Sequence, residues 1–172
     1  MQPNEFAQQL RQPRGDEILR CAEPHPPAQL RAGEVTPRPL AGIAISADGR
    51  TVVAVDDAQP TLFLIDTEAG RVREEIVLKD VPKAAQIARY APDNSLIGVT
   101  SLNSDTVSLI DPTFREQTAI KVGSQPMDIA FRGDELFVAC QGDGSMHVID
   151  VPGRRAKGSF KAGTGCESVG FF

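Results

Sequence analysis

The residue types best suited to chemistry in this 172-residue chain are three cysteines and two histidines. Cys21, Cys140 and Cys166 include no Cys-x-x-Cys pair, and the two histidines, His25 and His147, lie far apart in the sequence. Cys140 and Cys166 are a candidate thiol pair, but a disulfide needs Cα atoms within about 7 Å and a zinc site needs about two further ligands. Two separately buried free thiols are the simpler alternative. The sequence therefore predicts no metal site and no cofactor.

Familiar catalytic motifs are also missing from the sequence. It contains no Gly-x-Ser-x-Gly nucleophile motif, no Cys-x-x-Cys-His haem attachment and no glycine-rich phosphate loop before a helix. Acid–base catalysis would have to depend on carboxylates such as Asp128 and Glu167, and their spacing selects no pair. We therefore predict no catalytic residues and favour a non-enzymatic function.

Composition limits the class of protein. Hydrophobic residues make up 41% of the chain and charged residues 24%, which is typical of one soluble globular domain. A net charge of −5 and only 18 basic residues argue against binding to a nucleic-acid backbone. No apolar run approaches the roughly 20 residues that a membrane helix requires. The N-terminus lacks the basic-then-apolar order of a signal peptide, so the compartment is either the cytoplasm or one reached through an export signal absent from this sequence.

The N-terminal part differs from the rest because seven of the 13 prolines lie within residues 1–39. Prolines 24, 26 and 27 predict an extended connector, since proline lacks a donor and restricts the residue before it. Two stretches before this connector, 4–12 and 16–21, could each form a short helix. We interpret residues 1–27 as an arm outside the main domain.

Four sequence signals recur in constant order with a period of about forty residues. The clearest is a short apolar run that closes on Asp66, Asp111 and Asp150, which are 45 and 39 residues apart. A second run ends at positions 56, 101 and 140 with the same two spacings. The third signal starts at Ile43, Ala88, Ile129 and Val169, and the fourth ends at Gly33, Gly123 and Gly163. Such a period indicates a repeat architecture.

Each signal is rich in Val, Ile, Leu and Phe and is bounded by turn residues, which is typical of a β-strand. Asp48-Gly49 and Asp93-Asn94 are predicted as hairpin turns. Four strands in 40–45 residues, repeated, predict an all-β fold of four-stranded antiparallel β-propeller blades. A β-sandwich is the alternative, but it gives no reason for the matched spacing. The predicted blades are 39–81, 82–125 and 126–165, with lone strands at 28–33 and 166–172.

These motifs resemble the YVTN-type repeats of bacterial and archaeal β-propellers. Val107-Ser-Leu-Ile-Asp111 is similar to the Val-Ser-Val-Ile-Asp strand of that family, and Ala91-Pro-Asp-Asn94 to its Ser-Pro-Asp-Gly turn. The resemblance covers residues 28–172. It implies a propeller that is usually seven-bladed and commonly secreted, periplasmic or on the cell surface. Some relatives lie beside quinone or haem cofactors and others resemble lactone hydrolases, so a redox or lactonase-like propeller is the alternative function.

Three blades are fewer than the four to eight that form a ring. We therefore interpret the chain as part of a larger propeller, or as a protomer completed by another chain. Open blade faces should be apolar and should favour association with a protein partner or with further copies. We expect these exposed apolar residues to be Val53, Leu62, Leu64, Phe137 and Val148.

One edge of such a stack is a candidate binding surface. The loops from second to third strand, and from each fourth strand to the next blade, should emerge together on this edge, where propellers place binding residues. Acidic side chains there could attract a cation or a basic partner, although Asp, Asn and Gly are also simply good turn formers. The candidate ligand-binding residues are Asp56, Asp57, Asn103, Asp105, Gln141 and Asp143.

Overall fold

The computed structural model describes residues 38–113 and 115–171. Within them the chain forms antiparallel β-strands and one short 3₁₀-helix, η1 (Leu102–Ser104). The predicted arm (1–27), its two short helices and the predicted lone strand at 28–33 lie outside the described residues. Among the described residues no helix is long and apolar enough to cross a membrane.

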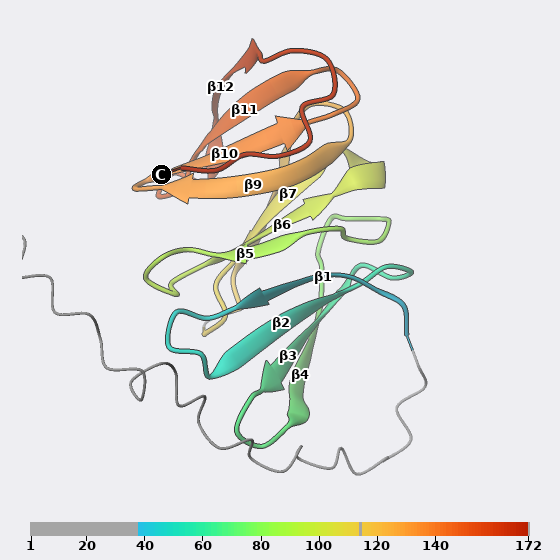
Figure 1. The fold of residues 1–172 in the computed structure, drawn as a ribbon, viewed down its shortest axis with the longest axis vertical. Helices are drawn as coiled ribbons and strands as arrows, with labels where there is room; N and C mark the ends of the chain where they lie inside the picture. The colour runs from blue at the N-terminus through green and yellow to red at the C-terminus, as the bar shows by residue number, and fades with distance from the viewer. Residues whose placement is uncertain (1–37, 114, 172) are drawn as a thin grey trace, which may run out of the picture. The chain divides into compact units, whose positions relative to one another are not determined.

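The strands form three four-stranded antiparallel sheets, which we call blades 1, 2 and 3 (Figure 1). Blade 1 contains β1 (Leu40–Ile45), β2 (Thr51–Asp56), β3 (Thr61–Asp66) and β4 (Arg71–Val77). Blade 2 contains β5 (Ala88–Tyr90), β6 (Ile97–Ser101), β7 (Thr106–Ile110) and β8 (Gln117–Lys121). Blade 3 contains β9 (Pro126–Arg132), β10 (Glu135–Cys140), β11 (Ser145–Asp150) and β12 (Arg155–Lys161). The predicted all-β fold of four-stranded blades is confirmed.

The hairpin turns between the first and second strands follow the predicted turn chemistry. Gly49 and Asn94 have φ values of 70° and 62°, in the left-handed region that glycine and asparagine tolerate. The Ser46 hydroxyl donates a hydrogen bond of 2.6 Å to Asp48, and the Ser95 hydroxyl donates one of 2.7 Å to Asp93. These local bonds fix the register of each hairpin and therefore the strand pairing behind it.

The blades stack in chain order, with two apolar layers between them. Successive residues of a strand point to opposite faces, so each blade has one face toward the preceding blade and one toward the next. We call these the receiving face and the covering face. The covering face of blade 1 packs on the receiving face of blade 2, and the core between them includes Val53, Leu62, Leu64, Ile97 and Val99. The covering face of blade 2 packs on blade 3 through Val107, Leu109, Leu136, Val138 and Ile149.

The prediction of which apolar residues are exposed was wrong for blade 1. Val53, Leu62 and Leu64 have no exposed surface, because they lie on the covering face beneath blade 2. The exposed apolar side chains belong to the alternate positions of the same sheet, on its receiving face. They are Leu40, Ile43, Ile45, Val72 and Val77, which are 42–66% exposed. On blade 3, Phe137 and Val148 do lie on the covering face, where both are partly buried.

The segment after blade 3 differs from its prediction as a strand. Residues 166–171 run beside β9 and β10 (Figure 1) without strand pairing. Phe171 packs edge-to-face on Phe137 with ring centroids 5.1 Å apart, and the Val169 N–H donates to Asp128 at 3.3 Å. Within the described residues no neighbouring strand forms a ladder of backbone hydrogen bonds with this segment, so it is not a β-strand. We call residues 166–171 the C-terminal segment.

Candidate functional site

A hollow of about 430 Å³ opens on the predicted loop edge at blade 3. It lies between the loop that joins β10 to β11 and the turn that follows β12. Its lining residues are Gln141, Gly142, Asp143, Gly144, Lys161, Gly163, Thr164 and Gly165. Two of the predicted ligand-binding residues, Gln141 and Asp143, therefore line one pocket.

Asp143 shapes this pocket through its own loop. Its Oδ1 accepts hydrogen bonds from the Ser145 hydroxyl at 2.6 Å and from the Ser145 N–H at 3.1 Å. The hydroxyl bond from Ser145 is the main reason why the pKa of Asp143 lies below its ordinary value, so the carboxylate stays charged at neutral pH. Lys161 Nζ donates to the Asp143 carbonyl oxygen at 2.6 Å. A carboxylate and an ammonium group thus border the same hollow.

Glycine is required where the two loops touch. Gly144 has φ = 65°, and a Cβ there would collide with the carbonyl oxygen of Gly163. The Gly144 carbonyl accepts hydrogen bonds from the N–H groups of Ala162 (2.9 Å) and Gly163 (3.3 Å). These bonds hold the walls of the pocket together, so the hollow is a built feature of the backbone. Lys161 and Thr164 were not among the predicted site residues, because only the contact between these loops brings them beside Asp143.

Loops of blades 2 and 3 are linked along the same edge. Asp105 Oδ1 accepts a hydrogen bond from the Gln125 N–H at 3.0 Å, and the Gln125 carbonyl accepts one from the Gln141 N–H at 2.9 Å. Gln141 Nε2 donates to Glu167 Oε1 at 2.6 Å. Asn103 is exposed on η1. The structure therefore brings Asp105 and Gln141 into one hydrogen-bonded series, with Asn103 on the neighbouring loop.

The prediction of an exposed acidic rim is corrected at Asp56. This side chain is fully buried at the end of β2 and accepts hydrogen bonds from the N–H groups of Ala58 (2.8 Å) and Gln59 (3.0 Å). Arg38 lies 3.3 Å from its other oxygen and also covers the ring of Phe63, 5.4 Å from the centroid. Asp56 therefore closes a turn and pairs with an arginine, whereas Asp57 beside it is exposed.

The candidate thiol pair is not a disulfide, because Cys140 and Cys166 are both free. Cys140 is fully buried, and burial raises the pKa of its thiol to about 11. A thiol in that state is a poor nucleophile and a poor metal ligand. His147 is partly buried opposite Val138, and burial lowers its pKa, as expected for a packing position. In the described residues, no group of three or more Cys, His, Asp and Glu could hold a metal ion.

The carboxylates considered for catalysis have structural partners. Asp128 Oδ1 pairs with Arg89 at 3.2 Å and also accepts the Ile129 N–H, while its Oδ2 accepts the N–H of Val169. Glu167 accepts the Gln141 amide described above. Both side chains therefore join the C-terminal segment to blade 3.

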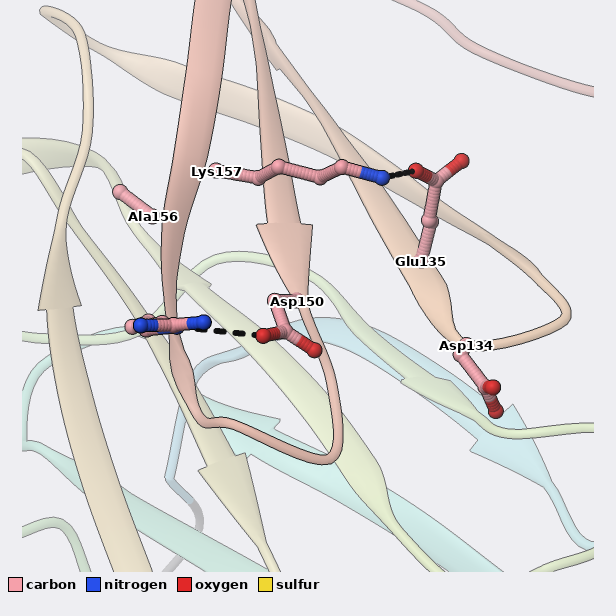
Figure 2. A pocket seen from close by; sticks show the side chains of 6 residues that line it. Asp134, Glu135, Asp150, Ala156 and Lys157 are labelled. Carbon is pink, nitrogen blue, oxygen red and sulfur yellow. Dashed lines mark hydrogen bonds and ion pairs between the residues drawn. The ribbon is translucent and has the colours of Figure 1, made fainter.

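A second hollow, of about 440 Å³, lies at the other end of β10 (Figure 2). Its walls carry two ion pairs, Lys157 with Glu135 at 2.5 Å and Arg155 with Asp150 at 3.2 Å. Four of its charged groups are paired with one another, Asp134 adds a further carboxylate, and none of the predicted ligand-binding residues lines this hollow. It is the weaker candidate for a binding site.

Comparisons with known proteins identify the fold. No protein-family model matches the sequence, and no curated protein matches it either. Solved structures do: Kuenenia stuttgartiensis hydrazine synthase is similar at TM-score 0.67 and 23% identity, over 77% of this chain and 40% of that one. The β-propeller domain of Myceliophteria thermophila Cps50 (Swd1) is similar at TM-score 0.59 and 18% identity, over 74% of this chain and 43% of that one. U3-55K is similar at TM-score 0.64 and 12% identity, over 72% and 39% respectively.

These similarities define the class of the protein, which is a β-propeller. The chain spans only about 40% of the length of the solved structures it matches. The identities are low, so the similarity concerns the fold.

Proposed function

We propose that this chain is a non-catalytic β-propeller module that binds a small polar ligand or a protein loop at its loop edge. The observation that carries the proposal is the hollow of about 430 Å³ between the β10–β11 loop and the turn after β12. It combines a carboxylate, an ammonium group and backbone groups of several glycines in a concave site on a rigid sheet, which is how β scaffolds usually hold ligands. A solved structure described as the WD40 repeats of RRP9, similar at TM-score 0.64, supports a propeller module of this general kind.

Two further parts of the proposal concern the family and the partner. The repeat motifs support membership of the YVTN-type propellers, and we infer that the blades belong to a ring completed by a protein partner or by self-association. The exposed apolar receiving face of blade 1 supports the second part, since monomeric proteins rarely leave such a surface uncovered.

Nuclear magnetic resonance of the isotopically labelled chain tests the loop-edge site. Three probes are titrated separately: a primary amine, a carboxylate and a free amino acid. We expect shifts of the amide signals of Gly142, Gly144, Gly163 and Gly165. Asp143→Asn keeps an acceptor for Ser145 and removes the charge, so it should weaken the response to the amine. Asp134→Asn, which removes a charge at the other end of β10, is the matched control, and shifts confined to other parts of the chain would contradict the proposal.

A second candidate function is a propeller segment of an enzyme. The similarity to hydrazine synthase, an enzyme by its name, favours it. An absorbance spectrum of the protein purified from its native source tests this candidate, because a bound haem or quinone gives visible bands. A spectrum without such bands would leave the binding module as the supported function.

A further inference from the structure

We propose that the receiving face of blade 1 binds the covering face of blade 3 in a second copy of this chain, so that two copies close one six-bladed ring. The inference starts from equivalent positions in the repeat. Ile43 and Ile45 on β1 correspond to Ala88 and Tyr90 on β5, and to Ile129 and Phe131 on β9. Ala88 and Ile129 are buried beneath the preceding blade, whereas Ile43 and Ile45 are 66% and 60% exposed.

The other strands of blade 1 show the same relation. Val52 and Ile65 pair across β2 and β3 on its receiving face. Their equivalents are fully buried, namely Ile97 and Ile110 in blade 2, and Leu136 and Ile149 in blade 3. Blade 1 therefore has the apolar receiving face of an internal blade, without a blade on it in the described residues.

Blade 3 has the complementary surface. On the covering face of blade 1, Leu62 pairs across strands with Ile76, and on that of blade 2, Val107 pairs with Ile120. Both pairs lie in the cores that these faces form with the next blade. The equivalent pair in blade 3 is Met146 with Phe160, and the Phe160 side chain is 54% exposed. The covering face of blade 3 thus resembles the covering faces of blades 1 and 2, which each pack on a receiving face. The receiving face of blade 1 in a second copy therefore fits it.

We call the contact between two stacked blade faces a seam. The charges at the proposed seam between the two copies are compatible with the pairing. In the two existing seams an arginine reaches the preceding blade, Arg115 to Glu74 at 2.9 Å and Arg154 to Glu116 at 3.3 Å. At the proposed seam Gly70 of blade 1 stands at the position of Arg115 and Arg154, and Arg155 of blade 3 stands at the position of Glu116. Glycine at that position avoids a clash of like charges, and Arg155 is already paired with Asp150. The new seam should therefore depend little on salt.

Area favours two seams over one. A four-stranded face with six residues per strand covers roughly 350 Å², from strand spacings of about 4.8 Å and a rise of about 3.3 Å. One contact between two faces buries only about 700 Å², below the usual range for a stable complex. A closed ring of two copies has two seams, buries about 1,400 Å² and falls within that range. Six blades are also within the four to eight that form rings.

The C-terminal segment holds the place that β1 of the second copy would take. Val169 and Phe171 are equivalent to Ile43 and Ile45 in the repeat, and Phe171 packs on Phe137 of the covering face. Phe171 is 45% exposed and the segment has no strand pairing. A complete blade brings more apolar contact than this segment, so β1 of the second copy displaces it.

Sedimentation and light scattering on the full chain test the proposal. We expect a species of twice 18.5 kDa. Ile43→Glu on the receiving face and Phe160→Glu on the covering face should each weaken the dimer by at least about 30-fold. Both positions are mostly exposed, so the variants should fold, which circular dichroism checks. Asn103→Glu adds the same charge outside both faces and is the control.

Mixing the two variants distinguishes this pairing from every other. One seam of the mixed pair combines an unaltered covering face with an unaltered receiving face, so the mixture should associate more tightly than either variant alone, and more weakly than the unaltered chain, which has two intact seams. Phe171→Gly removes the competitor and should tighten the dimer. A monomer of 18.5 kDa for the unaltered chain, a mixture that associates no more tightly than either variant alone, or a weaker dimer with Phe171→Gly would overturn the proposal. The loop-edge pocket is tested separately, by the amide titration.

Discussion

Gly98 provides the most direct test of how the blades pack. It lies on β6 at the seam between blades 2 and 3, where its equivalents are Val53 in blade 1 and Phe137 in blade 3. A Cβ at this position would lie 2.8 Å from Cδ1 of Ile129 and 3.3 Å from Cζ of Phe131. Gly98→Ala should therefore overpack the seam.

The expected effect of Gly98→Ala on the free energy of unfolding is the sum of two opposing contributions. Overpacking a well-packed core costs about 1–3 kcal/mol, and replacing glycine by alanine in ordinary backbone recovers about 0.4–1 kcal/mol through the unfolded chain. The contact at 2.8 Å is with the end of a flexible side chain, which places the cost toward the lower limit. We expect a net loss of up to about 1 kcal/mol in the free energy of unfolding, measured by urea denaturation.

A double-mutant cycle checks the stated cause. Ile129→Val removes the atom that the new methyl group would meet, so the cost of Gly98→Ala should fall in the Ile129→Val background, with a coupling energy of at least about 0.5 kcal/mol. Ala41→Gly, which changes a methyl group on β1 away from this seam, is a control for additivity. Additive effects of Gly98→Ala and Ile129→Val would refute the packing argument.

Three further predictions concern individual side chains. Asp56→Ala should lower the free energy of unfolding by about 1–3 kcal/mol, because it leaves the N–H groups of Ala58 and Gln59 without their acceptor and removes the nearer carboxylate of Arg38; a loss below about 0.5 kcal/mol in urea denaturation would contradict this. The pKa of Asp143 is lowered in the folded state, so its contribution to stability is present above the pKa of the unfolded chain and is lost as pH falls through the folded value. Asp143→Asn should therefore flatten the acid side of a stability–pH profile. Cys140, with a pKa of about 11, should react with a thiol reagent more slowly than the less buried Cys166, and equal rates in the folded chain would contradict its burial.

The fold was predictable because its signals are local and repeated. Alternating apolar residues and hairpin turns such as Asp48-Gly49 determine strand register without long-range information. The choice of face in blade 1 was not predictable in the same way. Residues 52–55 and 62–65 are apolar at every position, so a period of two does not separate one face from the other. Only the stacking of blade 2 decides that Val53 and Leu64 are buried.

The candidate site was predictable in part for a similar reason. Asp143 and Gln141 lie in a strand-connecting loop, and repeat topology places that loop on one edge of the blade. Lys161 and Thr164 join them only because the Gly144 carbonyl accepts hydrogen bonds from the turn after β12. The burial of Asp56 depends on Arg38, which precedes the first strand, and the positions equivalent to Asp56 in the other blades hold the uncharged residues Ser101 and Cys140. Contacts made outside the repeating unit were the ones that the sequence pattern could not supply.

The loop-edge pocket and the proposed seam share one element, the C-terminal segment. Glu167 in this segment accepts a hydrogen bond from Gln141 at the pocket wall, and Phe171 packs on Phe137 at the seam. Displacement of the segment by β1 of a second copy would break both contacts together, which frees the Gln141 amide for a ligand. By thermodynamic linkage, a ligand bound to that amide must then raise the dimer affinity by the same factor by which the dimer raises the ligand affinity. A titration that shifts Gly142 and Gly144 should therefore also raise the dimer fraction of the full chain, and Gln141→Ala should uncouple the two responses.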